Sequence, residues 1–310
     1  MRVLLAGATG AIGRYLVPLL VAAGHEVTGV ARTRGALAGT GATEIHADIT
    51  RRAQFLDAVS THSFDAVIHQ LSALGRTPMR YSDMGSTNRL RSEGTSTLIA
   101  AARRTGATKF VVASNVYGYG FRDHGKRLID EEYPFGQLPG TKLDAVQQSL
   151  LSAEQQARAF GGVALRYGLF YRGRGPVPPV ANDWNGLLPF VHVEDAAAAT
   201  VLALESGVPG RAYNIVDDEP VSWRELHQAR SDALYLPDPT YASTWLLKSL
   251  APFGSQLITA TSMRVSNARA RRELGWVPAF PTYRDSLAFE SDLATHAQDV
   301  LSGRTRRITG

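Results

Sequence analysis

Short apolar runs alternate with longer amphipathic stretches through the first two thirds of the chain. The runs have the length of buried strands, and the longer stretches have the period of helices. The strands are expected at 3–6, 26–31, 43–46, 65–69, 110–114 and 163–167. Such alternation is typical of a parallel sheet that helices cover on both faces. We therefore predict an α/β fold, a doubly wound parallel sheet.

The amphipathic stretches supply the helices of this prediction. They are expected directly after Gly13, weakly at 36–40, and then at 53–59, 86–105, 141–160 and 194–204. Residues 115–140 are rich in glycine and are expected to form a loop, and short returning strands are expected at 190–193 and 213–216.

The pattern also suggests how the chain divides. We expect a sheet domain of residues 1–168 with a returning segment, 188–216. A smaller C-terminal lobe, mostly helical, is expected from 169–187 and 217–302, where the alternation stops. Residues 303–310 are expected to be a frayed tail.

The turn after the first strand has glycines at the spacing Gly-x-x-Gly-x-x-Gly. In such a turn the first glycine permits the tight bend, the second lets a pyrophosphate approach the backbone, and the third lets helix and strand pack closely. The helix that follows offers free N–H groups and a positive dipole end to the same phosphates. We therefore predict a Rossmann-type dinucleotide site formed by Gly7, Thr9, Gly10, Ala11, Ile12 and Gly13.

The end of the second strand favours a phosphorylated dinucleotide. A carboxylate at this position would bind the ribose 2′-hydroxyl of NAD and repel a 2′-phosphate. The sequence has Arg32 and Arg34 there, whose guanidinium groups suit a phosphate. NADP(H) is predicted over NAD(H), and two ordinary surface arginines are the alternative.

Composition narrows the partners and the chemistry. The net charge is +5, but the basic residues are scattered in pairs with no aromatic-rich basic block, which argues against nucleic acid. The absence of cysteine excludes disulfides, thiol nucleophiles and thiolate metal sites, and no other metal-ligand spacing is present. No apolar run approaches membrane-spanning length and no signal peptide is evident, so a cytoplasmic protein without a membrane partner is expected.

Further short motifs follow the glycine turn in a regular order. They are Asp48-Ile49, Val67-Ile68-His69, Thr87-Asn88 with Gly94-Thr95, 190–196, 213–215 and 271–276. Together they resemble the extended short-chain dehydrogenase/reductase family, also called the NAD-dependent epimerase/dehydratase family. The resemblance implies that the sheet domain binds the dinucleotide and that the C-terminal lobe binds a small substrate.

The resemblance also assigns residues to the path of the cofactor. It implies that Asp48, with Ile49 beside it, hydrogen-bonds the adenine amino group, although Asp48 could instead cap the next helix. It implies that Gln70 and Leu71 line the path beyond the fourth strand. His69 could join them or could be a satisfied core histidine.

Family chemistry needs a Tyr-x-x-x-Lys pair and a Ser or Thr, and this sequence departs from that pattern. Lys142 stands at the lysine position, but Leu138 replaces the tyrosine, and leucine cannot transfer a proton. Asn115 stands at the Ser/Thr position, with Ser114 one place before it. Ordinary alcohol–ketone chemistry is therefore in doubt, while cofactor binding is not.

A tyrosine at another position could donate the proton in place of the missing family tyrosine. Tyr117 and Tyr119 follow the fifth strand at its C-terminal end, where open parallel sheets bind ligands. We predict that one of them passes the proton, that Lys142 orients the nicotinamide ribose, and that Asn115 and Ser114 polarise the substrate oxygen. Simple packing is the alternative for each tyrosine.

The leading hypothesis is an atypical NADP(H)-dependent oxidoreductase or epimerase of a small, partly apolar metabolite. Trp184 and 187–188 hint at the apolar character, and Arg172 and Arg174 could hold an anion. A redox-neutral dehydratase, cyclase or isomerase on the same scaffold, or a non-catalytic NADP(H)-sensing protein, are the alternatives.

The resemblance further allows a homodimer built from paired helices, as family members often form. Residues 86–105 and 141–160 would supply those helices, with Leu90, Leu98 and Leu151 on the paired face. The same leucines could instead pack on the sheet.

Overall fold

A parallel sheet forms the centre of the computed structural model, which describes residues 1–75, 77–171 and 175–301, with side chains to residue 292. Its seven strands run in the order β12-β7-β5-β4-β1-β2-β3, and every neighbouring pair is parallel. They are β1 (Arg2–Ala6), β2 (Glu26–Ala31), β3 (Thr43–His46), β4 (Ala66–His69), β5 (Lys109–Asn115), β7 (Val163–Tyr167) and β12 (Ala212–Ile215). The predicted doubly wound α/β fold is confirmed.

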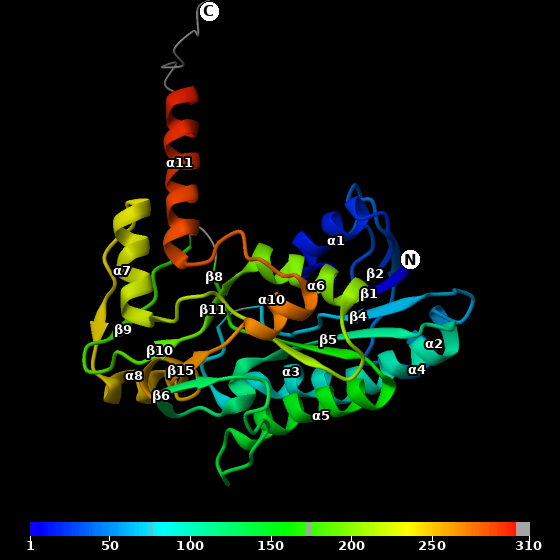
Figure 1. Cartoon of the computed structure of the whole chain (residues 1–310), viewed down its shortest axis with the longest axis horizontal. Helices are drawn as coiled ribbons and strands as arrows, with labels where there is room; N and C mark the ends of the chain where they lie inside the picture. The colour runs from blue at the N-terminus through cyan, green and yellow to red at the C-terminus, as the bar shows by residue number, and fades with distance from the viewer. Residues whose placement is uncertain (76, 172–174, 302–310) are drawn as a thin grey trace, which may run out of the picture.

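Helices cover both faces of this sheet (Figure 1). One layer contains α1 (Gly13–Ala22), α6 (Val193–Ser206) and α10 (Ala268–Leu274), and the other contains α2 (Arg52–Ala58), α4 (Thr95–Thr105) and α5 (Asp144–Phe160). Successive side chains of a strand point to opposite faces of the sheet, so one strand contributes side chains to the cores on both faces. In β1, Val3 and Leu5 pack into the first layer's core, and Leu4 and Ala6 into the second's.

The strand order reverses between β1 and β4. Chain order runs outward from β1 through β2 to β3 on one side, and from β4 through β5 to β7 on the other. Open parallel sheets bind ligands outside the carboxyl ends of the strands at such a point. Ala6 pairs with His69 there, so the glycine turn and Gln70 begin side by side.

The predicted helix at 86–105 is present with an irregularity. It consists of α3 (Gly85–Arg89), a π-helical turn η2 (Leu90–Gly94) and α4, preceded by the 3₁₀ turn η1 (Tyr81–Met84). Leu98 is completely buried against the sheet side of α4. This leucine therefore packs in the core, which was the alternative to a dimer face.

Two local predictions were wrong. Residues 36–40 form a turn and not a helix, since buried Leu37 anchors the turn and the Glu44 carboxylate accepts bonds from its backbone N–H groups. The loop predicted at 115–140 contains the 3₁₀ turn η3 (Val116–Tyr119) and β6 (Asp123–Ile129), which pairs with the distant β15 (Ser262–Val265).

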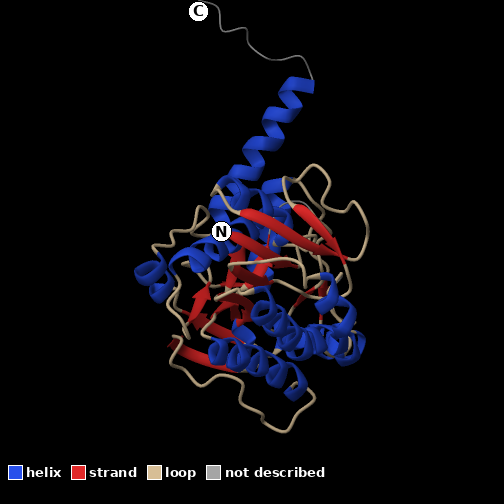
Figure 2. Ribbon diagram, turned by 90° about the vertical axis from the view of Figure 1, so that its right-hand side faces the viewer, coloured by secondary structure: helices blue, strands red, loops and turns tan. Residues whose placement is uncertain are grey.

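The C-terminal lobe lies at the end of the sheet where β8 (Leu169–Tyr171) and β11 (Phe190–His192) pair (Figures 1 and 2). Its helices are α7 (Trp223–Leu234), α8 (Thr244–Leu250), α9 (Gly254–Thr259) and α11 (Tyr283–Leu301). Two short strand pairs complete it, β9 (Val180–Ala181) with β14 (Tyr241–Ala242) and β10 (Leu187–Leu188) with β13 (Val221–Ser222).

Two sequence-based expectations lie outside the described residues, namely the anion-holding role of Arg172 and Arg174 and the frayed tail at 303–310. Within the described part of the chain, no helix is both long and apolar enough to cross a membrane.

Candidate functional site

A groove of about 480 Å³ opens at the carboxyl ends of β1, β2 and β4, and we call it the central groove. Its walls contain nearly all of the residues predicted to hold a dinucleotide. These are Gly7, Thr9, Gly10, Ala11, Ile12, Arg32, Asp48, Ile49, Gln70 and Leu71. Residues predicted from one glycine turn and the ends of three strands therefore lie together around one groove.

The glycine turn is shaped by close backbone contacts. Gly7 has a φ of +99°, and a Cβ there would lie 2.5 Å from the Gln70 carbonyl oxygen. Gly13 is buried where α1 starts, and a Cβ would lie 2.2 Å from the Gly7 carbonyl oxygen. Gly13 thus has the packing role predicted for it, and Gly7 permits the bend.

Gln70 supplies an unused acceptor in the groove wall. Its Nε2 donates to the Tyr167 hydroxyl at 2.8 Å and to Thr200 at 3.3 Å. Its Oε1 is buried and has no hydrogen-bond partner among the described residues. A buried amide oxygen without a partner is costly, so the site fits a bound molecule that brings an N–H or O–H donor.

A second cavity, of about 370 Å³, adjoins the central groove and shares Arg32, Ala47 and Asp48 with it. Arg32, His46, Asp48 and Arg51 line it, and its volume suits a phosphate with surrounding water. Burial opposes ionisation of Asp48, but the hydrogen bonds from Thr50 keep the pKa of Asp48 below its ordinary value. Asp48 therefore also caps the turn before α2.

Arg51, and not the predicted Arg34, lies with Arg32 in this second cavity. Arg51 shares the cavity with Arg32, whereas Arg34 is exposed in the turn that Glu44 holds over β3. Sequence reasoning missed Arg51 because Arg51 lies directly before α2, and strand β3 separates it from Arg32 along the chain.

The predicted Lys142 arrangement is not helical. α5 begins at Asp144, whose carboxylate accepts the N–H groups of Gly140 and Thr141, so both Leu138 and Lys142 precede the helix. Lys142 is exposed, with Nζ 5.9 Å from the centre of the Tyr81 ring, and Leu138 is 52% exposed. Neither residue is among those that form the central groove.

The hydroxyls of Ser114 and Tyr119 belong to a buried polar network that joins β5, α5 and β7. The Ser114 hydroxyl donates to Glu154 at 2.5 Å, and Glu154 pairs with Arg166 at 2.7 Å. Arg166 donates to the Tyr119 hydroxyl, which in turn donates to Asn214 at 2.7 Å. Burial raises the pKa of Tyr119 to about 12, which makes it a weaker acid than an ordinary tyrosine.

Tyr117 and Asn115 also face the protein interior. Tyr117 stacks on Phe121, and burial raises the pKa of its hydroxyl well above the usual range. The Asn115 side chain accepts the Tyr117 N–H at 2.9 Å and caps the 3₁₀ turn η3. The structure therefore does not bring the predicted catalytic residues Ser114, Asn115, Tyr117 and Tyr119 into the walls of the central groove.

His69 and Asp195, two titratable residues that could suggest catalysis, have structural partners. Burial lowers the pKa of His69 to about 4, and its ring nitrogens bond the Leu90 carbonyl and the Leu71 N–H. Asp195, near His192 in sequence, accepts the backbone N–H groups of Ala279 and Phe280, which ties α6 to the segment before α11.

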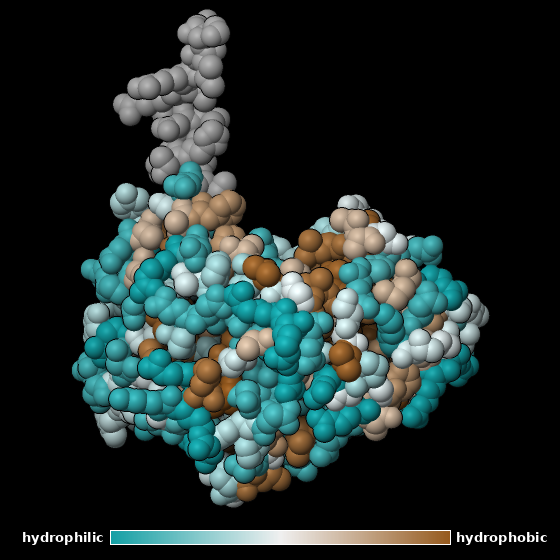
Figure 3. Space-filling view, viewed as in Figure 1, coloured by the Kyte–Doolittle hydropathy of each residue, from teal (hydrophilic) through white to brown (hydrophobic). Residues whose placement is uncertain are grey.

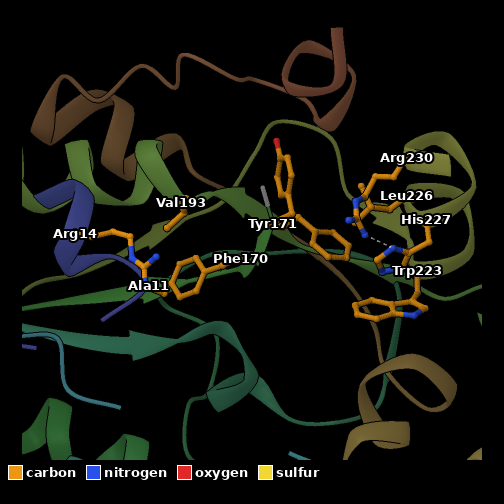
Figure 4. A pocket seen from close by; sticks show the side chains of 10 residues that line it. Ala11, Arg14, Phe170, Tyr171, Val193, Trp223, Leu226, His227 and Arg230 are labelled. Atoms are coloured by element: carbon orange, nitrogen blue, oxygen red, sulfur yellow. Dashed lines mark hydrogen bonds between the residues drawn. The ribbon is translucent and has the colours of Figure 1, made fainter. Parts of the chain in front are cut away.

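Sequence reasoning missed a third cavity, of about 290 Å³, which we call the aromatic pocket. It lies between α1 and α7, where Figure 3 shows the surface hollowed with apolar residues in the notch. It shares Ala11 and Phe170 with the central groove, so the two cavities adjoin. The other lining residues are Arg14, Tyr171, Phe190, Val193, Trp223, Leu226, His227 and Arg230 (Figure 4).

A helical spacing in the sequence could have revealed this pocket. Trp223, Leu226, His227 and Arg230 occupy positions i, i+3, i+4 and i+7 of α7, which share one face. A face that mixes an aromatic ring, an imidazole and a guanidinium is unusual for a purely structural helix. Within the described residues, no group of three or more His, Asp or Glu could hold a metal ion.

A model of the NAD dependent epimerase/dehydratase family matches residues 3–171, more than half of the chain. The chain belongs to that family, as its motifs predicted, and is an enzyme of this class of oxidoreductases and epimerases. The residues predicted to hold a nicotinamide dinucleotide mostly line the central groove.

Individual proteins are similar along nearly the whole length. A Streptomyces protein named 3-diazoavenalumate denitrifying reductase is 34% identical over 94% of this chain and 100% of its own. MoeE5, solved with UDP-glucose and NAD, is 24% identical with a TM-score of 0.75 over 96% of this chain and 100% of its own. The human epimerase family protein SDR39U1, solved with NADPH, is 21% identical with a TM-score of 0.74 over 94% and 99%. The two solved structures share the fold.

Proposed function

We propose that this enzyme is an NADPH-dependent reductase of a small aromatic substrate whose reduction needs no acid from the protein. The central groove holds the dinucleotide in this proposal, and the aromatic pocket beside it holds the substrate. The single observation that carries the proposal is that no tyrosine lines the central groove among the described residues. It supports the sequence-based expectation that Leu138 takes the place of the family tyrosine.

Tyr117 and Tyr119, the two tyrosines predicted to replace the family's proton donor, are engaged in the protein interior. Tyr119 is held between Arg166 and Asn214, and Tyr117 is buried under Phe121. Burial raises the pKa of both hydroxyls, which opposes proton release. A ketone would need a proton on its oxygen as hydride arrives, so a ketone is a poor substrate for this site.

An arenediazonium is a substrate that needs no proton. Bound NADPH supplies hydride, and the balanced reaction is Ar–N₂⁺ + NADPH → Ar–H + N₂ + NADP⁺. The C–N bond breaks, dinitrogen leaves with the bonding pair, and the carbon is reduced. The name of the Streptomyces relative, a denitrifying reductase of a diazo compound, supports this class of substrate.

The test uses NADPH deuterated at one or the other C4 position, with an arenediazonium as substrate. We expect deuterium in the arene from only one of the two labelled cofactors and no deuterium from D₂O. Tyr117→Phe and Tyr119→Phe should each retain turnover within about 3-fold, since neither hydroxyl moves a proton. Reduction of a ketone in place of the arenediazonium, or loss of turnover in Tyr119→Phe with the fold intact, would overturn the proposal.

The preference for NADPH over NADH follows in this proposal from Arg32 and Arg51. We expect Arg32→Ala and Arg51→Ala each to weaken NADPH binding by about 10- to 100-fold, the value of a charge-assisted hydrogen bond, and to leave NADH binding unchanged. Calorimetric titration measures both dissociation constants. Arg34→Ala is the matched control, because Arg34 is an exposed arginine outside the cavity. Equal affinity of the unmodified enzyme for NADH and NADPH would contradict this preference.

A further inference from the structure

The far end of the aromatic pocket contains a polar atom that the fold leaves unused. His227 is only 6% exposed, and its Nδ1 lies 2.8 Å from Nη1 of Arg230. A guanidinium can only donate, so Nδ1 accepts, and a neutral ring must carry its proton on Nε2. Nε2 is buried and has no hydrogen-bond partner among the described residues.

The imidazole is neutral in this setting. Burial, and then the neighbouring Arg230 cation, lowers the pKa of His227 to about 3. The Nε2–H group is therefore a buried donor that costs stability unless something accepts from it. Because a cation donates to the other ring nitrogen, the Nε2–H is polarised and prefers a strongly basic or anionic oxygen.

His227 and Arg230 both line the aromatic pocket, so a ligand bound there lies against the imidazole. Figure 4 shows His227 and Arg230 projecting from α7 toward Tyr171 and Phe170, with Arg14 of α1 at the opposite end. Trp223 packs edge-on against the imidazole with 4.4 Å between ring centres, which fixes the ring plane. Arg230 also donates to the Gly175 carbonyl and interacts with Glu290, so Arg230 serves here to set the tautomer of His227.

The remaining walls select the shape of the ligand. Phe170, Tyr171, Phe190 and Trp223 provide aromatic surface, and none of the described residues in the lining is acidic. Arg14 is exposed at the groove end and has no ion pair among the described residues. A cavity of about 290 Å³ with apolar sides, one buried donor and no anion suits a small planar molecule with a negative end.

We infer that the aromatic pocket binds the substrate as a planar aromatic carboxylate, whose carboxylate accepts from Nε2 of His227 while the ring extends past Phe170 toward the central groove. This inference rests on the proposed function, since it names the class of substrate that the reductase takes. His227 is then a specificity-determining residue, and Arg230 is the residue that positions its proton.

The test titrates cinnamate and its uncharged analogue cinnamamide by calorimetry into the NADP⁺-saturated enzyme and into the enzyme without nucleotide. We expect cinnamate to bind about 10- to 100-fold more tightly than cinnamamide in both forms, as a charge-assisted hydrogen bond predicts. His227→Phe should remove this preference and leave NADP⁺ affinity unchanged. His227→Gln, whose amide N–H can take the place of Nε2–H, should restore most of it. His62→Phe, at an exposed histidine outside the pocket, is the control.

The two proposals fail in different ways in this experiment. The carboxylate inference is overturned if cinnamate and cinnamamide bind equally well, or if His227→Phe binds cinnamate with full affinity. If the enzyme still binds NADP⁺ in that case, the reductase proposal is not affected. Failure to bind NADP⁺ or NADPH at all overturns the proposed function, and the titration without nucleotide still decides the carboxylate inference.

Discussion

Gly7→Ala is expected to weaken NADPH binding by about 100-fold or to abolish it. The reason is twofold. Alanine resists the φ of +99°, and its Cβ would lie 2.5 Å from the backbone oxygen of Gln70, which is no flexible side chain that could move aside. The glycine turn and the start of the Gln70 segment must then separate, and both are walls of the central groove. Calorimetric titration with NADPH measures the loss.

Gly24→Ala is the matched control for this experiment. Gly24 also has a positive φ, +80°, but a Cβ there would meet nothing within 4 Å. It should cost only the backbone strain, about 1–2 kcal/mol of stability, and leave NADPH affinity unchanged. Thermal melts of both variants separate unfolding from loss of binding. If Gly7→Ala bound NADPH as tightly as the parent enzyme, the turn would not be the phosphate cradle.

Local sequence signals sufficed for the fold because the sheet is built from them. The central strands β1, β4 and β5 contain short apolar runs, and β1 divides its side chains between two cores by simple alternation. The groove was predictable for the same reason, since in a parallel sheet the residues that follow neighbouring strands meet at one edge.

Pairings between distant segments could not be predicted in this way. β6 pairs with β15 from more than 130 residues away, and no local pattern marks Asp123–Ile129 as a strand. Likewise Ser114 was predicted to polarise the substrate oxygen because it stands one place before the family's Ser/Thr position, and Tyr119 was predicted to pass the proton because it follows β5. Their hydroxyls are engaged instead by Glu154 and Arg166, which come from α5 and β7. Such partners depend on the tertiary fold, which sequence spacing does not reveal.

Arg166→Met is expected to destabilise the enzyme by about 3–5 kcal/mol, the cost of leaving one member of a buried ion pair without its partner. Glu154 and Arg166 are 2.7 Å apart, with side chains 6% and 4% exposed. Removing the guanidinium leaves the Glu154 carboxylate with only the Ser114 hydroxyl, and it frees the hydroxyl of Tyr119 from its donor. Chemical denaturation followed by circular dichroism measures the change.

The pair of Arg2 and Asp65 provides a control with nearly the same geometry. Its nitrogen and oxygen are 2.8 Å apart, but both side chains are more than 40% exposed, so water solvates each charge when the other is removed. Arg2→Met should therefore leave the denaturation midpoint almost unchanged. The double variant Glu154→Gln with Arg166→Met should be more stable than Arg166→Met alone, because it no longer buries an unpaired charge. An equally small effect of Arg166→Met and Arg2→Met would mean that the buried network does not hold β5, α5 and β7 together. Ser114 and Tyr119 would then lose the structural role that excludes them from catalysis.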